Sequence, residues 1–261
     1  MSQTNDSVAG VPAIAVEGLA KRYGDFVAVR DLDFEISAGE VVGFLGPNGA
    51  GKTTTMRMLT GFIPATDGHA RLAGHDIFSE ATQARAAVGY LPETPPLYPE
   101  MTPASYVDFV ARLKGVARRD RKTAVERALD RCGLIDVRNR EIRQLSKGYR
   151  QRVGLAQAIV HDPKVLILDE PTVGLDPIQI REIRALIQDL SATGGQTILL
   201  STHILAEVDA ICQRVILLDR GHKVLDQPLT ELTGGGTSLE EVFARAMSRD
   251  EAASVEGGEA A

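Results

Sequence analysis

The sequence predicts an α/β fold: a mostly parallel core sheet, an N-terminal antiparallel β layer and an inserted helical subdomain. Three observations support this prediction. Short apolar runs with turn signals dominate up to about residue 40, helical periodicity dominates at about 95–160, and strands then alternate with helices. Strands connected by helices of this length form right-handed βαβ units, which build parallel sheets.

The antiparallel layer is predicted from runs in which apolar and polar residues alternate, separated by tight-turn residues at 23–25 and 37–39. These runs are Ile14–Val16, Phe26–Val29 and Phe34–Ile36. The next run, Val41–Leu45, is nearly all apolar, which is typical of a strand buried on both faces. A helix is predicted after it, from near Lys52 to Gly61.

Two helices are predicted in the inserted subdomain at about 95–160. The first has an N-cap and first-turn pair in Thr102–Pro103 and a C-terminal stop at Gly115. The second has an apolar face over 124–132 and ends at Gly133. Charged residues fill its opposite face, which we therefore expect to be exposed to solvent.

The last third of the chain returns to alternating strands and helices. Strands are predicted at Val165–Leu168, Thr197–Leu200 and Val215–Leu218, and helices around Ile180–Leu190 and Leu205–Ile211. We expect residues 13–248 to form one domain. Residues 1–12 are expected to be a disordered lead-in and the acidic residues 249–261 a flexible tail.

Composition excludes several classes of protein. The net charge of -6 and the pI of about 5.5 argue against nucleic acid as the main partner. A membrane span needs about 20 consecutive apolar residues, and no run here approaches that length. Residues 1–12 lack the pattern of a secretory signal, and two distant cysteines favour reduced thiols over a disulfide or a zinc site. A cytoplasmic chain is expected.

The strongest motif is a glycine-rich loop that fits the pattern G-x-x-x-x-G-K-[ST] in full. Its residues are Gly46, Pro47, Asn48, Gly49, Ala50, Gly51, Lys52 and Thr53, and Thr54 follows. The loop lies between a buried strand and a helix, so its backbone amides and the helix N-terminus can bind phosphate. Lys52 is predicted to reach the β- and γ-phosphates of ATP, and Thr53 to ligate Mg²⁺. The sequence therefore predicts a P-loop NTPase.

An acidic pair ends the predicted strand at 165–168. Side chains alternate along a strand, so Asp169 and Glu170 are expected to face opposite ways and to have different roles. Asp169 is predicted to help hold the magnesium ion, and Glu170 to orient and polarise the attacking water. An ordinary acidic turn before Pro171 is the alternative for this segment when it is considered alone.

Together with these motifs, the segment Leu145–Tyr149 resembles the signature motif of ABC transporter ATP-binding subunits. The resemblance extends over nearly all of residues 14–248. It implies that Ser146 and the Gly148 amide contact ATP held by a second copy of the chain. It also implies that Tyr23 stacks on adenine, that Asp176 belongs to the loop linking two active sites, and that His203 contacts the γ-phosphate.

Two departures from the family pattern point to one branch of it. Glu93 stands where the family usually has a glutamine, and it is expected to contribute to metal binding. The signature carries Lys147 and Tyr149 in place of the common glycine and glutamine. Both departures, with the following segment 94–102, resemble the ABC-2 type exporter branch. That branch includes drug-resistance, gliding-motility and copper-site-maturation ATPases.

The resemblance implies an ATP-hydrolysing motor subunit with ATP and Mg²⁺ as cofactors. It also implies a homodimer of ATPase subunits bound to an integral-membrane permease at the inner face of the cell membrane. The alternatives are the ATPase of an ABC importer, a soluble ABC ATPase without a transport role, and a regulatory ATP-binding module. The transported substrate is chosen by the permease and is not encoded in this chain.

Overall fold

The core of the molecule is a six-stranded sheet with the strand order β10-β9-β3-β8-β7-β6. The computed structural model describes residues 11–234 and 238–258. The strands are β3 (Val41–Leu45), β6 (Val88–Leu91), β7 (Val165–Asp169), β8 (Thr197–Thr202), β9 (Arg214–Asp219) and β10 (His222–Pro228). All neighbours are parallel except β10, which pairs antiparallel with β9. The predicted mostly parallel core sheet is therefore confirmed.

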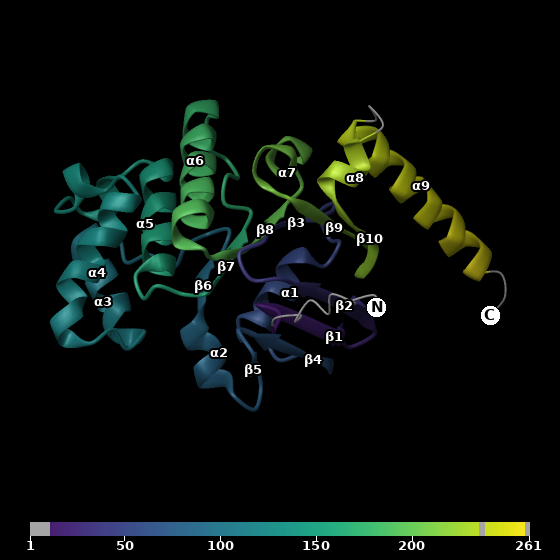
Figure 1. Cartoon of the computed structure of the whole chain (residues 1–261), viewed down its shortest axis with the longest axis horizontal. Helices are drawn as coiled ribbons and strands as arrows, with labels where there is room; N and C mark the ends of the chain where they lie inside the picture. Colours follow the sequence, from purple (N-terminus) through teal and green to yellow (C-terminus); the bar gives the residue numbers. More distant parts are fainter. Residues whose placement is uncertain (1–10, 235–237, 259–261) are drawn as a thin grey trace, which may run out of the picture.

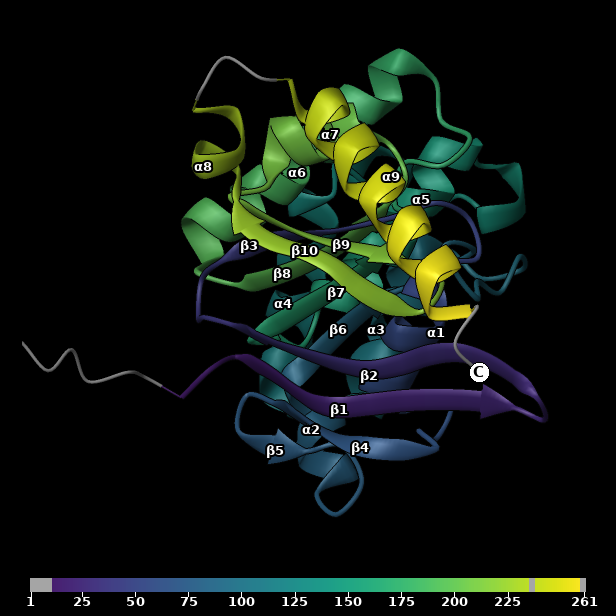
Figure 2. The same cartoon turned by 90° about the vertical axis from the view of Figure 1, so that its right-hand side faces the viewer.

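A second, antiparallel sheet has the order β2-β1-β4-β5 and lies beside the core sheet (Figures 1 and 2). Its strands are β1 (Ile14–Tyr23), β2 (Phe26–Ile36), β4 (Asp67–Leu72) and β5 (His75–Asp76). Strand β2 joins two of the predicted apolar runs into one strand. The polar residues between those runs include Asp31, whose φ of 39° coincides with an irregularity in the pairing with β1.

Both faces of the core sheet are covered, and successive residues of its strands enter different hydrophobic clusters. Leu166 and Leu168 of β7 pack with the helices on one face. Val165 and Ile167 pack with the antiparallel sheet and helix α1 (Lys52–Leu59) on the other. This alternation explains why the central strands are apolar throughout, since neither face meets water.

The inserted subdomain consists of α3 (Pro103–Leu113), α4 (Arg118–Arg131) and α5 (Lys147–Ile159), which pack together at one end of the molecule (Figure 1). The predicted N-cap is confirmed, because Thr102 and Ser105 form a reciprocal capping box at the start of α3. Helix α4 begins at Arg118, before the predicted apolar face. Its first residues are mostly charged and have no apolar periodicity, so the apolar pattern does not predict this start.

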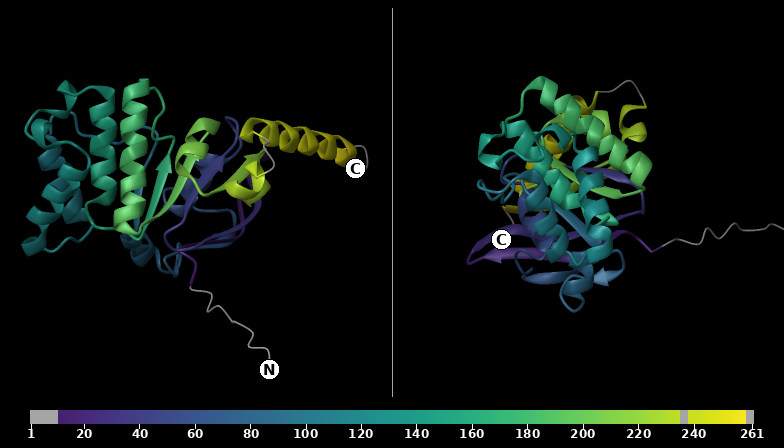
Figure 3. Two further views of the ribbon diagram at one scale, coloured as in Figure 1. Left: turned by 45° about the horizontal axis from the view of Figure 1, so that its top comes forward. Right: turned by 90° about the vertical axis from the view of Figure 1, so that its left-hand side faces the viewer.

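The C-terminal part contains α6 (Pro177–Gly194), α7 (Leu205–Ile211), α8 (Leu229–Thr233) and α9 (Leu239–Gly258), and α2 (Ala81–Ala87) precedes β6. Figure 3 shows α9 at the end of the molecule opposite the inserted subdomain. Residues 249–258, expected to be part of a flexible tail, belong to this helix, because alanine and glutamate favour helix strongly. Residues 1–10 of the predicted lead-in and 259–261 of the predicted tail lie outside the described residues.

Cys132 and Cys212 are both free and buried, and burial raises the pKa of each thiol to about 12.

None of the helices in the described part of the chain combines the length and apolar character that a bilayer span requires.

Close packing between β6 and α5 gives a first testable prediction at Gly89. A Cβ there would lie 2.1 Å from the carbonyl oxygen of Ala158 in α5 and 2.7 Å from Leu166 Cδ2. We expect Gly89→Ala to lower the free energy of unfolding by about 2 kcal/mol, and the melting temperature by roughly 6 °C, because backbone must move. Gly194→Ala, where the nearest atom would lie at 3.4 Å, is the matched control and should melt at or above the wild-type temperature. Equal melting of the two variants would contradict the prediction.

Candidate active site

A cavity of about 360 Å³ opens where several strands of the core sheet end and the phosphate loop begins. It is lined by Phe26, Ala28, Asn48, Gly49, Gly51, Lys52, Thr53, Thr54, Glu93, Glu170, Val173 and His203. The loops after β3, β6, β7 and β8 all contribute, since the carboxyl ends of parallel strands meet at one edge. Ligand sites in open α/β sheets lie at this edge.

The phosphate loop has the backbone shape that its glycines permit. Gly49 and Gly51 have φ of 85° and 100°, in the left-handed region that favours glycine. Gly46 lies against β9, where a Cβ would meet the carbonyl oxygen of Leu218 at 2.4 Å. Helix α1 follows directly, and Gly51 has no side chain to cap it. No side chain of the N-cap residue competes for the amide groups in the first turn of α1, which is the arrangement of helix N-termini that bind anions.

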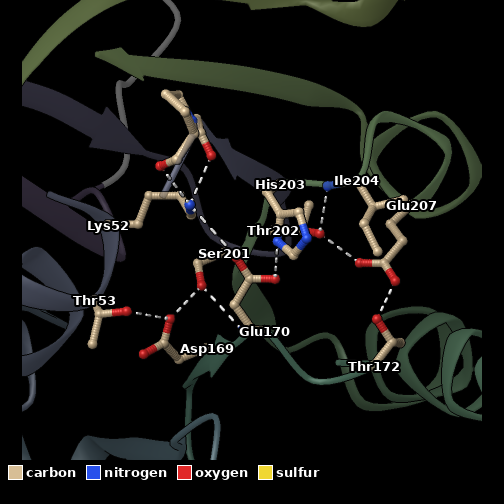
Figure 4. A network of polar contacts seen from close by, with 12 residues as sticks. Lys52, Thr53, Asp169, Glu170, Thr172, Ser201, Thr202, His203, Ile204 and Glu207 are labelled. Carbon is tan, nitrogen blue, oxygen red and sulfur yellow. Dashed lines mark hydrogen bonds and ion pairs between the residues drawn. The ribbon is translucent and has the colours of Figure 1, made fainter. Parts of the chain in front are cut away.

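Lys52 lies at the base of the cavity, with only 6% of its side chain exposed. Its Nζ donates to the carbonyl oxygens of Gly46, at 2.7 Å, and Pro47, at 3.2 Å. It also lies 3.5 Å from Oε1 of Glu170. The ammonium group is thus held beside both the loop predicted to bind phosphate and the carboxylate predicted to act on water (Figure 4).

Asp169 ends β7 and is almost completely buried. Its Oδ1 accepts hydrogen bonds from Ser201 Oγ at 2.5 Å and Thr53 Oγ1 at 3.3 Å. Its Oδ2 is buried without a hydrogen-bond partner among the described residues. Burial raises the pKa of Asp169, and the nearby charge of Glu93 raises it further. A buried carboxylate with a free oxygen, beside a threonine hydroxyl, fits the oxygen ligands that Mg²⁺ prefers.

The magnesium ligands expected from the sequence are Thr53, Glu93 and Asp169. Thr53 and Glu93 line the cavity, and Asp169 contacts Thr53. In the described part of the chain, no group of three or more His, Cys, Asp or Glu side chains could hold a metal by itself.

Glu170 directly follows β7, and its carboxylate lies against Lys52 and His203 rather than beside the Thr53 hydroxyl that Asp169 binds (Figure 4). Its Oε2 lies 2.9 Å from Nδ1 of His203, and only 8% of its side chain is exposed. The backbone at Glu170 has φ of 48°, a left-handed conformation that is uncommon for a residue with a side chain. Its amide donates to both the carbonyl oxygen and Oγ of Ser201, each at 3.1 Å, which holds the residue in this conformation. Strain of this kind is concentrated at functional sites.

The residues of the signature segment lie outside this cavity. Ser146 is the N-cap of α5, and its Oγ accepts from the amide of Tyr149 at 3.4 Å. Gly148 is buried beside α6, where a Cβ would meet Gln179 at 2.7 Å. Asp176 caps α6, accepting from the amides of Ile178 and Gln179 at 2.9 Å each. Among the described residues that line the cavity, none belongs to this group.

The aromatic side chain in the cavity wall is Phe26 rather than the predicted Tyr23. These two residues pair across the turn between β1 and β2, and Lys21 Nζ lies 5.1 Å from the centroid of the Tyr23 ring. Phe26 is 65% exposed and lines the cavity from strand β2. The alternating pattern predicts only a strand position for Phe26, and its place directly after the turn next to Tyr23 is the signal that points to the cavity.

Comparisons with known proteins agree with this geometry. The family model described as ABC transporter matches residues 29–173. The ABC transporter ATP-binding protein YhcH of Bacillus subtilis is 40% identical over 82% of this chain and 68% of its own length. The bacitracin transport ATP-binding protein BcrA of Enterococcus faecalis is 38% identical, over 84% and 70%. The Nod factor export ATP-binding protein I of Ralstonia nicotianae is 37% identical, over 83% and 67%.

Solved structures give the same result. The structure of an ATP-binding subunit of an ABC transporter is similar, with a TM-score of 0.81 and 28% identity over 90% of this chain and 99% of that one. The dimeric structure of MJ0796, a bacterial ABC transporter cassette, has a TM-score of 0.75 and 25% identity, over 83% and 98%. The phosphate loop, Glu170 and His203 line one cavity of a fold that these relatives have in common, and Asp169 lies beside that cavity in contact with Thr53. The chain belongs to the ABC transporter family and is an ATP-binding, ATP-hydrolysing member of it.

Proposed function

We propose that the chain is the ATP-hydrolysing motor subunit of a membrane exporter and that it works as a head-to-tail dimer bound to a permease. The export direction is supported by Glu93 and the variant signature, and by relatives whose names refer to Nod factor export and bacitracin transport. The alternative for the direction of transport is that the chain is the ATPase of an importer. Inside-out vesicles that contain the chain and its permease would decide it, since an exporter fills them in the presence of ATP.

The proposed roles follow from the contacts in the cavity. Amides of the phosphate loop and the ammonium of Lys52 bind the triphosphate, and Thr53, Asp169 and Glu93 hold Mg²⁺. When bound, Mg²⁺ neutralises charge on the phosphate oxygens. Glu170 accepts the proton of the attacking water, and His203, which lies 2.9 Å from it, contacts the γ-phosphate.

The observation that carries the dimer is that the cavity holds only part of the predicted ATP contacts. Ser146 and the first turn of α5 form a second anion-binding helix N-terminus that lies outside it. In a head-to-tail pair, each cavity meets the α5 N-terminus of the other copy, and two composite sites result. Closure on ATP and opening after hydrolysis give the two states that a permease can use.

The permease is proposed to dock on the inserted subdomain. A cavity of about 490 Å³ separates the loop that follows β6 from the start of α5. Its walls include Glu93, Pro95, Leu97, Ile142 and Arg143. Because Glu93 also lines the cavity of the active site, a permease helix seated here would lie close to the proposed magnesium ligands.

A test of the dimer uses Glu170→Gln, which is expected to bind ATP without hydrolysing it. With saturating Mg-ATP this variant should elute as a dimer in size-exclusion chromatography with light scattering, and as a monomer without nucleotide. The double variant Glu170→Gln/Ser146→Arg is the matched control and should stay monomeric, because the arginine blocks the contact at the α5 N-terminus. If Glu170→Gln stays monomeric with saturating Mg-ATP, the head-to-tail model is wrong.

A further inference from the structure

Glu207 is a buried carboxylate that the proposed mechanism does not use. It lies in α7 and is only 1% exposed. Its Oε2 accepts a hydrogen bond from Thr202 Oγ1 at 2.6 Å, and its Oε1 accepts one from Thr172 Oγ1 (Figure 4). Both donors are buried as well. One carboxylate thus binds two hydroxyl groups, one from the loop after β7 and one from the end of β8.

The Thr172 hydroxyl belongs to the loop that carries Glu170. Thr172 follows Glu170 by two positions, and the two are part of a tight turn in which the Val173 amide donates to the Glu170 carbonyl oxygen at 3.2 Å. The Leu175 amide donates to the carbonyl oxygen of Thr172 at 3.1 Å. Fixing Thr172 therefore fixes the loop in which Glu170 has its left-handed backbone conformation.

The second hydroxyl belongs to the segment that carries His203. Thr202 precedes this histidine, and its Oγ1 also accepts from the amide of Ile204, which follows it, at 3.1 Å. The amide of Glu207 donates to the carbonyl oxygen of Ile204 at 3.0 Å. His203 is therefore flanked on both sides by residues tied to Glu207.

The burial of Glu207 needs an explanation beyond packing. A buried carboxylate is costly unless it is hydrogen-bonded, and an apolar side chain of similar volume often stabilises a fold as well or better. Hydroxyl–carboxylate bonds are short, strong and directional, so they fix the positions of the groups that they join. Here the groups joined are the two loops whose side chains meet in the 2.9 Å contact between Glu170 and His203.

We propose that Glu207 is a positioning residue for ATP hydrolysis. Through Thr172 and Thr202 it fixes the position of the Glu170 loop relative to the His203 segment. This inference rests on the roles proposed above for Glu170 and His203. A misplacement of about 1 Å in a reacting group can lower the rate about a hundredfold. The two hydrogen bonds of Glu207, although outside the cavity, can therefore affect the rate of hydrolysis.

The test measures hydrolysis of bound ATP in a single turnover, together with ATP affinity, in the full chain. Glu207→Gln keeps the shape but replaces one acceptor oxygen with an amide nitrogen. We expect the rate to fall about tenfold or more, and affinity to stay within about twofold, because the triphosphate contacts lie elsewhere. Loss of packing alone would lower stability without this separation of rate from affinity.

Matched pairs at the two threonines test the same bonds from the other side. Thr172→Val and Thr202→Val keep the shape of threonine but lose its hydroxyl. Thr172→Ser and Thr202→Ser keep the hydroxyl. We expect the valine variants to be about tenfold slower than the corresponding serine variants. The double variant Glu207→Gln/Thr172→Val should lose less than the product of the two single effects, since both changes act on one bond.

These outcomes separate the inference from its premise. Wild-type rates in Glu207→Gln and both valine variants, with Glu170→Gln inactive, would overturn the role of Glu207 and leave that of Glu170 intact. Full activity of Glu170→Gln would overturn the proposed role of Glu170, and that of Glu207 with it. If Glu207→Gln does not fold, the serine and valine pairs decide alone: equal rates within each pair contradict the inference.

Discussion

Replacement of Glu170 by glutamine is expected to slow ATP hydrolysis about a thousandfold, the size typical for loss of a general base. Glutamine has the same shape, but its amide cannot take up the proton of the attacking water. The neighbouring groups should stay in place, because the backbone amide of Glu170 remains bonded to Ser201. Single-turnover quench-flow with radiolabelled ATP measures the rate, and the affinity for ATP should change by no more than about twofold.

The control for this prediction is Glu182→Gln. Glu182 also contacts a cation, Arg152, at 2.5 Å, but it lies on α6 and its side chain is 49% exposed. Exposed ion pairs contribute little, so this variant should hydrolyse ATP at the wild-type rate. A Glu170→Gln chain that hydrolyses bound ATP as fast as the control would show that another group activates the water.

Replacement of Lys52 by methionine is expected to weaken ATP binding about a hundredfold, equivalent to about 3 kcal/mol. Methionine keeps most of the apolar stem but removes the charge. The bonds from Nζ to the carbonyl oxygens of Gly46 and Pro47, which place the charge at the phosphate loop, are lost with it. Titration with a fluorescent ATP analogue, in the Glu170→Gln background to prevent turnover, measures the change.

Lys52→Arg is the informative control for this second prediction. Arginine keeps the positive charge, but its planar guanidinium is larger and cannot donate from one point to Gly46 and Pro47 as the ammonium does. Binding should therefore be intermediate between the wild type and Lys52→Met. Equal affinity of Lys52→Met and the wild type would mean that the amides of the loop alone hold the triphosphate.

The groups at the bottom of the cavity could be predicted from the sequence because each occupies a fixed place relative to a strand end. Lys52 follows β3, Asp169 ends β7 with Glu170 directly after it, and His203 follows β8. In a parallel sheet these ends meet at one edge, so the motifs and the topology together bring Lys52, Glu170 and His203 into one cavity with Asp169 beside it. Alternation along a strand predicts different directions for Asp169 and Glu170, but β7 ends at Asp169, and the left-handed backbone of Glu170 sets the direction of its side chain.

Other features left no such signal. Thr172 and Glu207 are 35 positions apart in the sequence. A threonine in a loop and a single acid in a short helix match no motif, so their contact cannot be predicted from the sequence. The helix over residues 249–258 has no distinct sequence signal, because an acidic, alanine-rich composition suits both a tail and a helix. Phe26 lines the cavity because of the geometry of one turn, which alternation along a strand does not reveal.

The two native cysteines have a practical consequence for measuring the proposed closure. Burial raises the pKa of each thiol far above neutral pH, so the reactive thiolate is scarce. Maleimide and nitroxide reagents attack the thiolate, so Cys132 and Cys212 should stay unlabelled and need not be replaced. A cysteine introduced at the exposed Arg119 in α4 would then report, by fluorescence or spin-label distances, how far two copies separate in each turnover.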